Sequence, residues 1–86
     1  MRAQKRDSNE EEIVSALLSC GYEVLRCNGL PFDLLVGRRF WIVIEVKAPT
    51  GRLTDSQERF FGGRGTAPRF VVRTAQEALE VAGRYC

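Results

Sequence analysis

The segment Ile44-Glu45-Val46-Lys47 places a carboxylate and an ammonium group two residues apart in an apolar stretch of chain. In an extended strand, successive side chains point to opposite faces, so Glu45 and Lys47 share one face. Burying such charges is costly unless they are paired or used in chemistry. Two interpretations follow: an ion pair where the strand meets solvent, or part of a reactive centre.

Asp33 favours the second interpretation, because it lies in the preceding predicted strand. If the two strands pair as a hairpin, Asp33 and Glu45 lie toward the same end of the sheet. Two adjacent carboxylates repel each other, and a hard divalent cation relieves that repulsion. Mg²⁺ prefers oxygen ligands and retains several waters, so the two carboxylates, the backbone carbonyl of Val46 and water suffice to hold Mg²⁺ or Mn²⁺.

Other kinds of chemistry lack the residues that they need. The chain contains no histidine, which excludes histidine–metal nucleases, histidine general bases and cysteine–histidine nucleophile pairs. Its three cysteines, Cys20, Cys27 and Cys86, form no CxxC motif, which argues against a disulfide framework and against a zinc ribbon. Carboxylate-based metal chemistry is therefore the chemistry that the composition favours.

The elements that position these residues are predicted in the order α-β-β-β-α-β-α. Helices are predicted where Ser or Thr is followed three residues later by Glu or Gln, the capping-box pattern, and strands where short apolar runs lie between turns. The elements are a helix from Ser8 (with Glu11) to Gly21, strands Tyr22–Cys27, Phe32–Val36 and Phe40–Val46, a helix opened by Thr54 and Gln57, strand Arg69–Arg73, and a helix opened by Thr74 and Glu77.

This order predicts one α/β domain, residues 1–86, built on a mixed sheet flanked by helices. The apolar run Phe40–Val46 is typical of a central strand that is buried on both faces. Trp41 could serve as a platform for base stacking, but its place in so apolar a strand favours the core.

The charge distribution offers candidate contacts to DNA. The net charge is only +2, but from Arg38 to Arg73 eight positive residues stand against three negative ones, and most positive residues of the chain are arginine, which binds phosphate in a bidentate manner. Arg52 and Arg59 follow the central strand and are candidate phosphate contacts, although a solvated surface explains the arginines about as well. No secretory leader follows Met1, and no apolar run approaches the ~18 residues of a membrane span, so a cytoplasmic protein without membrane contact is expected.

The motif formed by Phe32-Asp33, eleven intervening residues and Glu45-Val46-Lys47 resembles the PD-(D/E)XK nuclease signature. Residues 48–57, with a Pro/Gly turn, a basic residue and a helix that carries a glutamine, resemble the VRR-NUC branch, and residues 10–26 are also similar to archaeal Holliday-junction resolvases. The resemblance covers residues 10–80. It implies a restriction-endonuclease-like α-β-β-β-α-β core, followed here by an extra C-terminal helix. Pro31 stands one residue further from the aspartate than in the signature.

The resemblance also implies roles for individual residues. Asp33 and Glu45 would bind the metal ion, and Lys47 would orient or help deprotonate the attacking water. Gln57 would lie near the nucleophile or the phosphate, although its capping box with Thr54 explains it equally well. The resemblance further implies an acidic residue in the first helix. Glu10 is the candidate because it lies on the stripe that faces the sheet, but acidic residues also favour helix N-termini in general.

The predicted function is metal-dependent hydrolysis of DNA phosphodiester bonds by a homodimer, on branched, flap or junction DNA. Short loops leave little room for an element that reads bases, so recognition of DNA shape is expected. The alternative is a catalytically silent module of nuclease fold that binds DNA or a partner protein. A third interpretation, an interaction domain whose Glu45 and Lys47 form only an ion pair, leaves the spacing of Asp33 unexplained.

Overall fold

The computed structural model describes residues 9–63 and 65–86. Its elements follow the predicted order, and the expected α/β class with a mixed sheet is confirmed. The elements are α1 (Glu10–Ser19), β1 (Glu23–Arg26), β2 (Leu34–Gly37), β3 (Trp41–Val46), α2 (Asp55–Phe61), β4 (Arg69–Val72) and α3 (Ala75–Tyr85).

The four strands form one sheet in the order β1-β2-β3-β4. The first three are antiparallel, whereas β4 runs parallel to β3 after a crossover that contains α2. In the β2–β3 hairpin, Leu34 is opposite Ile44 and Gly37 is opposite Trp41. The end of β3 that carries Glu45 therefore lies beside the start of β2, as the hairpin prediction requires.

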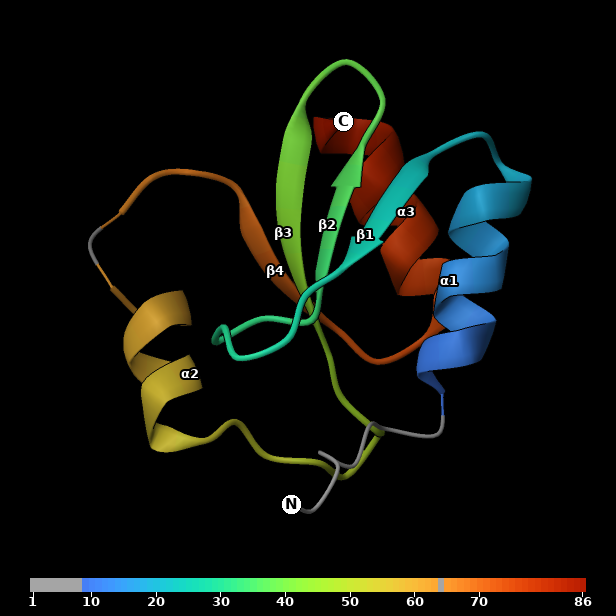
Figure 1. Cartoon of the computed structure of the whole chain (residues 1–86). Coiled ribbons are helices and arrows are strands. Elements are labelled where there is room, and N and C mark those ends of the chain that lie inside the picture. The colour runs from blue at the N-terminus through green and yellow to red at the C-terminus, as the bar shows by residue number, and fades with distance from the viewer. Residues whose placement is uncertain (1–8, 64) are drawn as a thin grey trace.

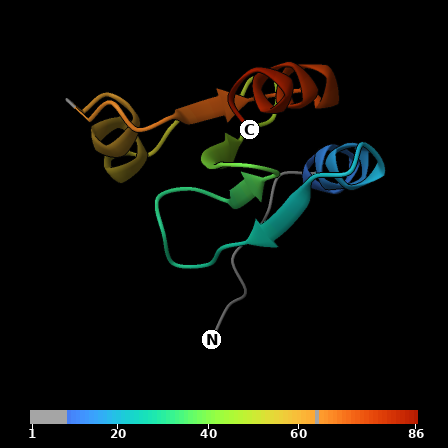
Figure 2. The same cartoon turned by 90° about the horizontal axis from the view of Figure 1, so that it is seen from above.

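Helices α1 and α3 lie side by side over one face of the sheet, and α2 lies on the opposite side, next to β4 (Figures 1 and 2). The covered face forms the core, because apolar side chains of both helices pack there against alternate strand residues. The core residues are Ile13, Val14, Leu17, Tyr22, Leu34, Val36, Ile42, Ile44, Val46, Val72, Ala78 and Ala82.

The other face of the sheet, called here the open face, is buried at one end only. Side-chain alternation and the strand register place Leu25, Leu35, Trp41, Val43 and Glu45 on it. Glu45 is buried, but Trp41 is 50% exposed and Leu25 is 53% exposed. The predictions that β3 is buried on both faces and that Trp41 belongs to the core are therefore wrong for the half of the strand away from Glu45.

The indole of Trp41 covers a backbone surface instead of filling the core. A Cβ atom on Gly37 would lie 2.7 Å from ring atom Cε3 of Trp41, so only glycine allows the ring to lie this close to β2. Because one side of the ring rests on Gly37, the other side faces solvent. Glycine opposite an aromatic residue thus produces a flat apolar surface on the open face.

The end of α1 agrees with the sequence pattern. Gly21 has φ of 88°, a left-handed conformation that glycine adopts readily. The amide of Tyr22 donates to the carbonyl of Leu17 (3.1 Å), and that of Gly21 donates to Leu18 (3.0 Å), which is the Schellman arrangement. At the other end of α1 the predicted capping box includes Ser8, which lies outside the described residues.

The two other predicted capping boxes differ from each other. Thr54 and Gln57 form the complete reciprocal box at the start of α2, as predicted. At the start of α3, the hydroxyl of Thr74 accepts from the amide of Glu77 (3.0 Å), but the Glu77 carboxylate accepts from the amide of Arg73 (2.6 Å). The Glu77 carboxylate therefore holds the end of β4 in place of the cap residue.

Strand β2 begins two residues later than predicted, because Phe32 belongs to the preceding loop. Its ring stacks on Phe60 of α2, with ring centroids 5.5 Å apart. Asp33 consequently lies immediately before β2 and not within it. Across residues 9–63 and 65–86, no helix is both long and apolar enough to span a bilayer.

Candidate active site

Glu45 is the centre of the candidate site at the end of β3. Its side chain is only 2% exposed, and one of its oxygens, Oε2, has two partners. The ammonium of Lys47 lies 3.3 Å from Oε2, and the side-chain amide of Gln57 donates to Oε2 at 2.8 Å. The other oxygen, Oε1, is buried and has no hydrogen-bond partner within residues 9–63 and 65–86. An unpartnered buried carboxylate oxygen is costly, so this site is incomplete as a purely structural ion pair.

Asp33 approaches the same place from the start of β2. Its amide donates to the carbonyl of Ile44 (3.1 Å), and its carboxylate oxygen Oδ2 accepts from the amide of Val46 (2.8 Å). The Asp33 carboxylate thus accepts from the Val46 amide in place of the backbone carbonyl that a longer β2 would provide. Because the N–H and C=O of one strand residue point the same way, the carbonyl of Val46 also faces the side of Asp33. The structure therefore brings Asp33, Glu45 and the Val46 backbone together, as predicted.

The electrostatics of Glu45 differ from those of a simple ion pair. The pKa of Glu45 is raised to about 7, mainly by desolvation on burial and next by the negative charge of Asp33, against the opposing effect of Lys47. A lysine partner alone would lower the pKa of the carboxyl. Near neutral pH, the second carboxylate and the dry surroundings therefore outweigh the ammonium, and additional positive charge would stabilise the ionised form.

The residues at this point fit a hard divalent cation. Two adjacent carboxylates, an unpartnered oxygen on Glu45 and the carbonyl of Val46 are the kind of oxygen donors that Mg²⁺ and Mn²⁺ accept. In the described part of the chain, no three His, Cys, Asp or Glu side chains gather closely enough to hold a metal by themselves. A cation here would thus depend on backbone and water ligands besides the two carboxylates, which is typical of Mg²⁺.

Gln57 forms the predicted cap and also contacts Glu45, while its catalytic role stays a prediction. Its side-chain oxygen Oε1 accepts from the amide of Thr54 (2.9 Å), which completes the capping box. The nitrogen of the same carboxamide, Nε2, donates to Glu45 Oε2. Capping fixes the rotamer of Gln57 and thereby aims its donor at Glu45. One carboxamide group therefore both caps α2 and contacts the candidate site.

Glu10 is buried, at 3% exposure, and so faces inward as predicted. Its carboxylate lies 3.6 Å from Nε of Arg26, whose Nη2 is 3.0 Å from Glu11. These ion pairs give Glu10 a structural partner on β1. Its catalytic role stays a prediction.

Asn9 and Arg73 are functional candidates that the sequence reasoning missed. Nδ2 of Asn9 donates to the carbonyls of Lys47 (3.0 Å) and Arg73 (2.8 Å). The guanidinium of Arg73 contacts carbonyls of the turn after Lys47. The sequence pattern predicted Ser8, and not Asn9, as the cap of the first helix. Arg73 did not stand out among the many arginines of the chain. The only sequence signal for Arg73 was its place between the predicted strand and the helix cap Thr74.

The arginines divide into structural and solvent-facing groups. Arg38 lies over the ring of Tyr22, 4.0 Å from its centroid, and Arg69 donates to the carbonyl of Phe60. In contrast, Arg52 and Arg59 are exposed, and their side chains make no hydrogen bond or ion pair to another residue that the structure describes. The two predicted phosphate contacts are therefore available to a ligand.

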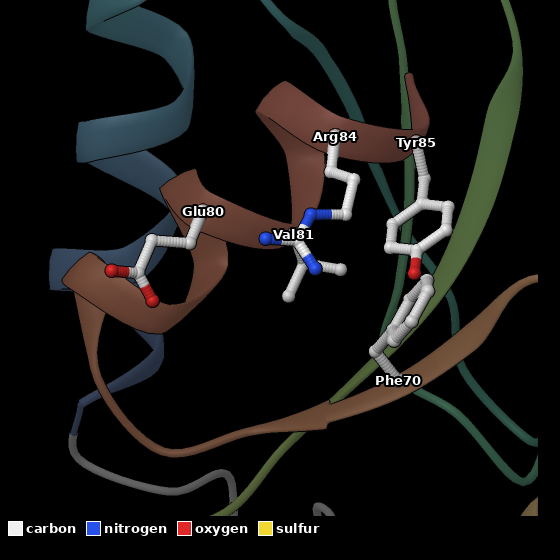
Figure 3. Close-up of a pocket in the computed structure, with 5 residues that line it drawn as sticks. All are labelled: Phe70, Glu80, Val81, Arg84 and Tyr85. Carbon is white, nitrogen blue, oxygen red and sulfur yellow. The ribbon is translucent and has the colours of Figure 1, made fainter.

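A pocket of about 240 Å³ lies elsewhere, between β4 and α3 (Figure 3). It opens on the helix-covered side of the sheet, since Phe70 alternates with the open-face residue Val71. Its lining is not shared with the candidate site. The lining residues are Phe70, Glu80, Val81, Arg84 and Tyr85.

No family model, no curated protein sequence and no solved structure matches the chain. The geometry around Glu45 therefore carries the functional conclusion.

Proposed function

We propose that this chain is a metal-dependent DNA endonuclease of the PD-(D/E)XK kind, similar to VRR-NUC domains, with a restriction-endonuclease-like core. The observation that carries the proposal is the convergence of Asp33, Lys47 and Gln57 on Glu45, which retains a buried oxygen without a partner. A plain structural ion pair does not need the second carboxylate, and it gains nothing from the orphaned oxygen.

The roles of the side chains follow from their chemistry. Asp33, Glu45 and the Val46 carbonyl would hold Mg²⁺ or Mn²⁺. A cation bound there supplies a water of lowered pKa and offsets negative charge on the scissile phosphate. The ammonium of Lys47 is half-buried beside Glu45, where it can orient the attacking water and balance phosphate charge. Gln57 fixes the Glu45 carboxylate through its amide.

DNA is the proposed partner because Arg52 and Arg59 stand exposed along the chain that leaves the site. Two arginine side chains that are exposed, with no partner in the described part of the chain, are suited to phosphate contacts, which position DNA without reading its sequence. The loops near the site are short, so we propose selection by shape, with branched, flap or junction DNA as substrates.

A homodimer through the open face is also proposed. Leu25, Leu35, Trp41 and Val43 form an apolar patch away from Glu45, which we call the open-face patch. With Trp41 50% and Leu25 53% exposed, the patch leaves roughly 300 Å² of apolar surface in contact with water. A patch of this size is within the range of the largest apolar patches on monomers, which often serve a function, and it would supply most of the apolar part of a standard interface of about 800 Å² per partner. The patch itself contains no charged side chain, although the register places Glu23 and Arg69 at its border, so a second copy of the same patch fits it better than DNA does.

One assay tests the enzyme. Purified protein is incubated with plasmid, flap and four-way-junction DNA in the presence of Mg²⁺, Mn²⁺ or EDTA. We expect cutting with either metal, none with EDTA, and none with Glu45→Gln or Lys47→Ala. Glu12→Gln is the matched control, because Glu12 is exposed on α1 and should cut like the wild type. DNA binding without cutting under any metal would establish the silent binding module instead.

A further inference from the structure

The segment between Lys47 and Gln57 connects two side chains that meet on one oxygen atom. Lys47 and Gln57 both contact Oε2 of Glu45, yet one belongs to the end of β3 and the other to α2. The chain between them begins with a tight turn in which the amide of Gly51 donates to the carbonyl of Ala48 (2.9 Å). Proline at the second position suits such a turn. Residues 48–51 are called here the strap.

Arg73 holds the strap from the neighbouring strand end. Its Nη1 donates to the carbonyls of Ala48 (2.6 Å), Gly51 (2.8 Å) and, more weakly, Pro49 (3.4 Å). One guanidinium nitrogen thus contacts three of the four carbonyls of the strap. These carbonyls belong to a turn that has no strand or helix to satisfy them, so Arg73 replaces the missing backbone partners.

The backbone of Arg73 is itself held at both of its polar groups. Its amide donates to the Glu77 carboxylate (2.6 Å), and its carbonyl accepts from Nδ2 of Asn9 (2.8 Å). Nδ2 of Asn9 also donates to the carbonyl of Lys47 (3.0 Å). A single amide group therefore joins the end of β4 to the residue of β3 that enters the strap.

Asn9 gives up its ordinary role to make this contact. It occupies the N-cap of α1, where an asparagine usually accepts a helix amide, but its side chain makes no capping bond. Its Oδ1 is instead buried, with no hydrogen-bond partner among the residues that the structure describes. The Asn9 side chain thus leaves its own helix uncapped and bridges two strand ends. We infer that this bridge is its structural role.

We propose that Arg73 and Asn9 are positioning residues of the active site. They fix the strap so that Lys47, before it, and Gln57, after it, meet on Oε2 of Glu45. This inference rests on the proposed nuclease function for its kinetic consequence, but its geometric consequence is independent of any activity. Without the Arg73 donors, the strap carbonyls turn to water, and the start of α2 is no longer tied to β3.

The test compares Arg73→Met with Arg69→Met. Both residues lie at ends of β4, and both donate from Nη1 to carbonyls, but Arg69 holds the far end of α2 through Phe60 (2.8 Å). Two measurements are made on each protein. The first is the NMR signal of the Gln57 side-chain amide, whose hydrogen bond to Glu45 shifts it downfield and slows its exchange with water. The second is single-turnover DNA cleavage with Mg²⁺.

We expect Arg73→Met to lose the downfield Gln57 signal and to slow cleavage by about 10- to 100-fold, because small misplacements of reacting groups have effects of that size. Arg69→Met should keep the signal and cleave within about threefold of wild type, even if its thermal stability falls as far. Arg73→Lys should restore much of both, since an ammonium also carries several donors for carbonyl oxygens.

The outcomes for the positioning role and for the nuclease activity can be told apart. If a folded Arg73→Met keeps the Gln57 signal, or if Arg69→Met loses it equally, the positioning role is wrong. If Arg73→Met does not fold, Asn9→Ala releases the strap at Lys47 and must lose the same signal. If the wild type cuts no DNA, the proposed function fails, and the Gln57 signal alone still decides whether Arg73 positions the site.

Discussion

The two ends of strand β3 invert the usual relation between burial and polarity. At the first end, the apolar ring of Trp41 is 50% exposed, whereas near the last end the carboxylate of Glu45 is only 2% exposed. The hydrophobic effect would favour the opposite arrangement. Because each end is unfavourable for an isolated chain, the proposed cation and the proposed second copy would each relieve one of them.

The two ends of β3 differ in the kind of partner that would lower the energetic cost of each. Glu45 has one partnered oxygen, one orphaned oxygen and a raised pKa, so it lacks positive charge. Trp41 has a flat apolar surface backed by Gly37, so it lacks apolar cover. A cation suits the Glu45 end of β3, and a second protein surface suits the Trp41 end. The following predictions separate these two explanations.

The largest effect is expected from Asp33→Asn. The asparagine oxygen can still accept from the amide of Val46, so the fold should persist. The charge that helps to hold the cation is lost, and both Mn²⁺ affinity and cleavage should fall by about 100-fold or more. Titration calorimetry and single-turnover cleavage measure the two. Asp55→Asn, on the exposed start of α2, is the control, and an equal loss there would remove Asp33 from the site.

The raised pKa of Glu45 predicts how stability depends on pH when metal is absent. Between its ordinary pKa of 4.5 and its folded value of about 7, the folded protein retains a proton that the unfolded chain has released. Raising the pH through this window therefore favours unfolding, by about 3 kcal/mol at most. In EDTA, urea unfolding should show this loss from pH 5 to pH 8 in wild type.

Glu45→Gln removes the titrating group and serves as the reference for that measurement. Its free energy of unfolding should change less across the same pH range, so that the variant becomes the more stable protein at pH 8. If the two proteins lose stability in parallel, Glu45 does not carry the raised pKa, and the electrostatic part of the comparison fails.

Much of this arrangement was predictable from sequence, because it depends on local patterns. The hairpin register that brings Asp33 to Glu45 follows from two short apolar strands around one turn. The capping box of Thr54 and Gln57 is set by residues three apart. The side of β3 that carries Glu45 and Lys47 follows from alternation alone.

The remainder depends on contacts between distant parts of the chain. Whether an apolar strand is covered on its second face depends on where α2 packs, and α2 packs beside β4 (Figure 2), while Trp41 stays 50% exposed. The contacts of Asn9 with Lys47 and Arg73 span 38 and 64 residues, and no local pattern signals them. For the same reason, the sequence could not show that one carboxamide of Gln57 serves both the cap and Glu45.

The apolar end of β3 is tested by a matched pair of leucines. Leu25 is 53% exposed on the open-face patch, and Leu18 is 54% exposed on α1. Leu25→Glu should raise the dimer dissociation constant by about tenfold or more, because it places an unpaired charge in an apolar interface, whereas Leu18→Glu should not. Analytical ultracentrifugation measures this constant. Trp41 is the only tryptophan, so its emission should shift to the blue as wild type is concentrated.

Two outcomes would contradict the proposed dimer interface. If wild type remains a monomer at every concentration, or if both variants dimerise equally well, the open-face patch is not the interface between two copies. Circular dichroism of both variants shows whether each is folded, so a loss of association is not mistaken for unfolding.

The smallest effect separates capping from chemistry at Gln57. Thr54→Ala removes the hydroxyl that accepts from the Gln57 amide, which costs about 1 kcal/mol of stability. The amide of Thr54 remains, so Gln57 Oε1 can still accept from it, and Nε2 still points at Glu45. Cleavage should therefore change little in Thr54→Ala but fall about tenfold or more in Gln57→Ala, at similar stability. If both variants lose cleavage in proportion to stability, Gln57 acts only as a cap, and Glu45 is held at its end of β3 by Lys47 and Asp33 alone.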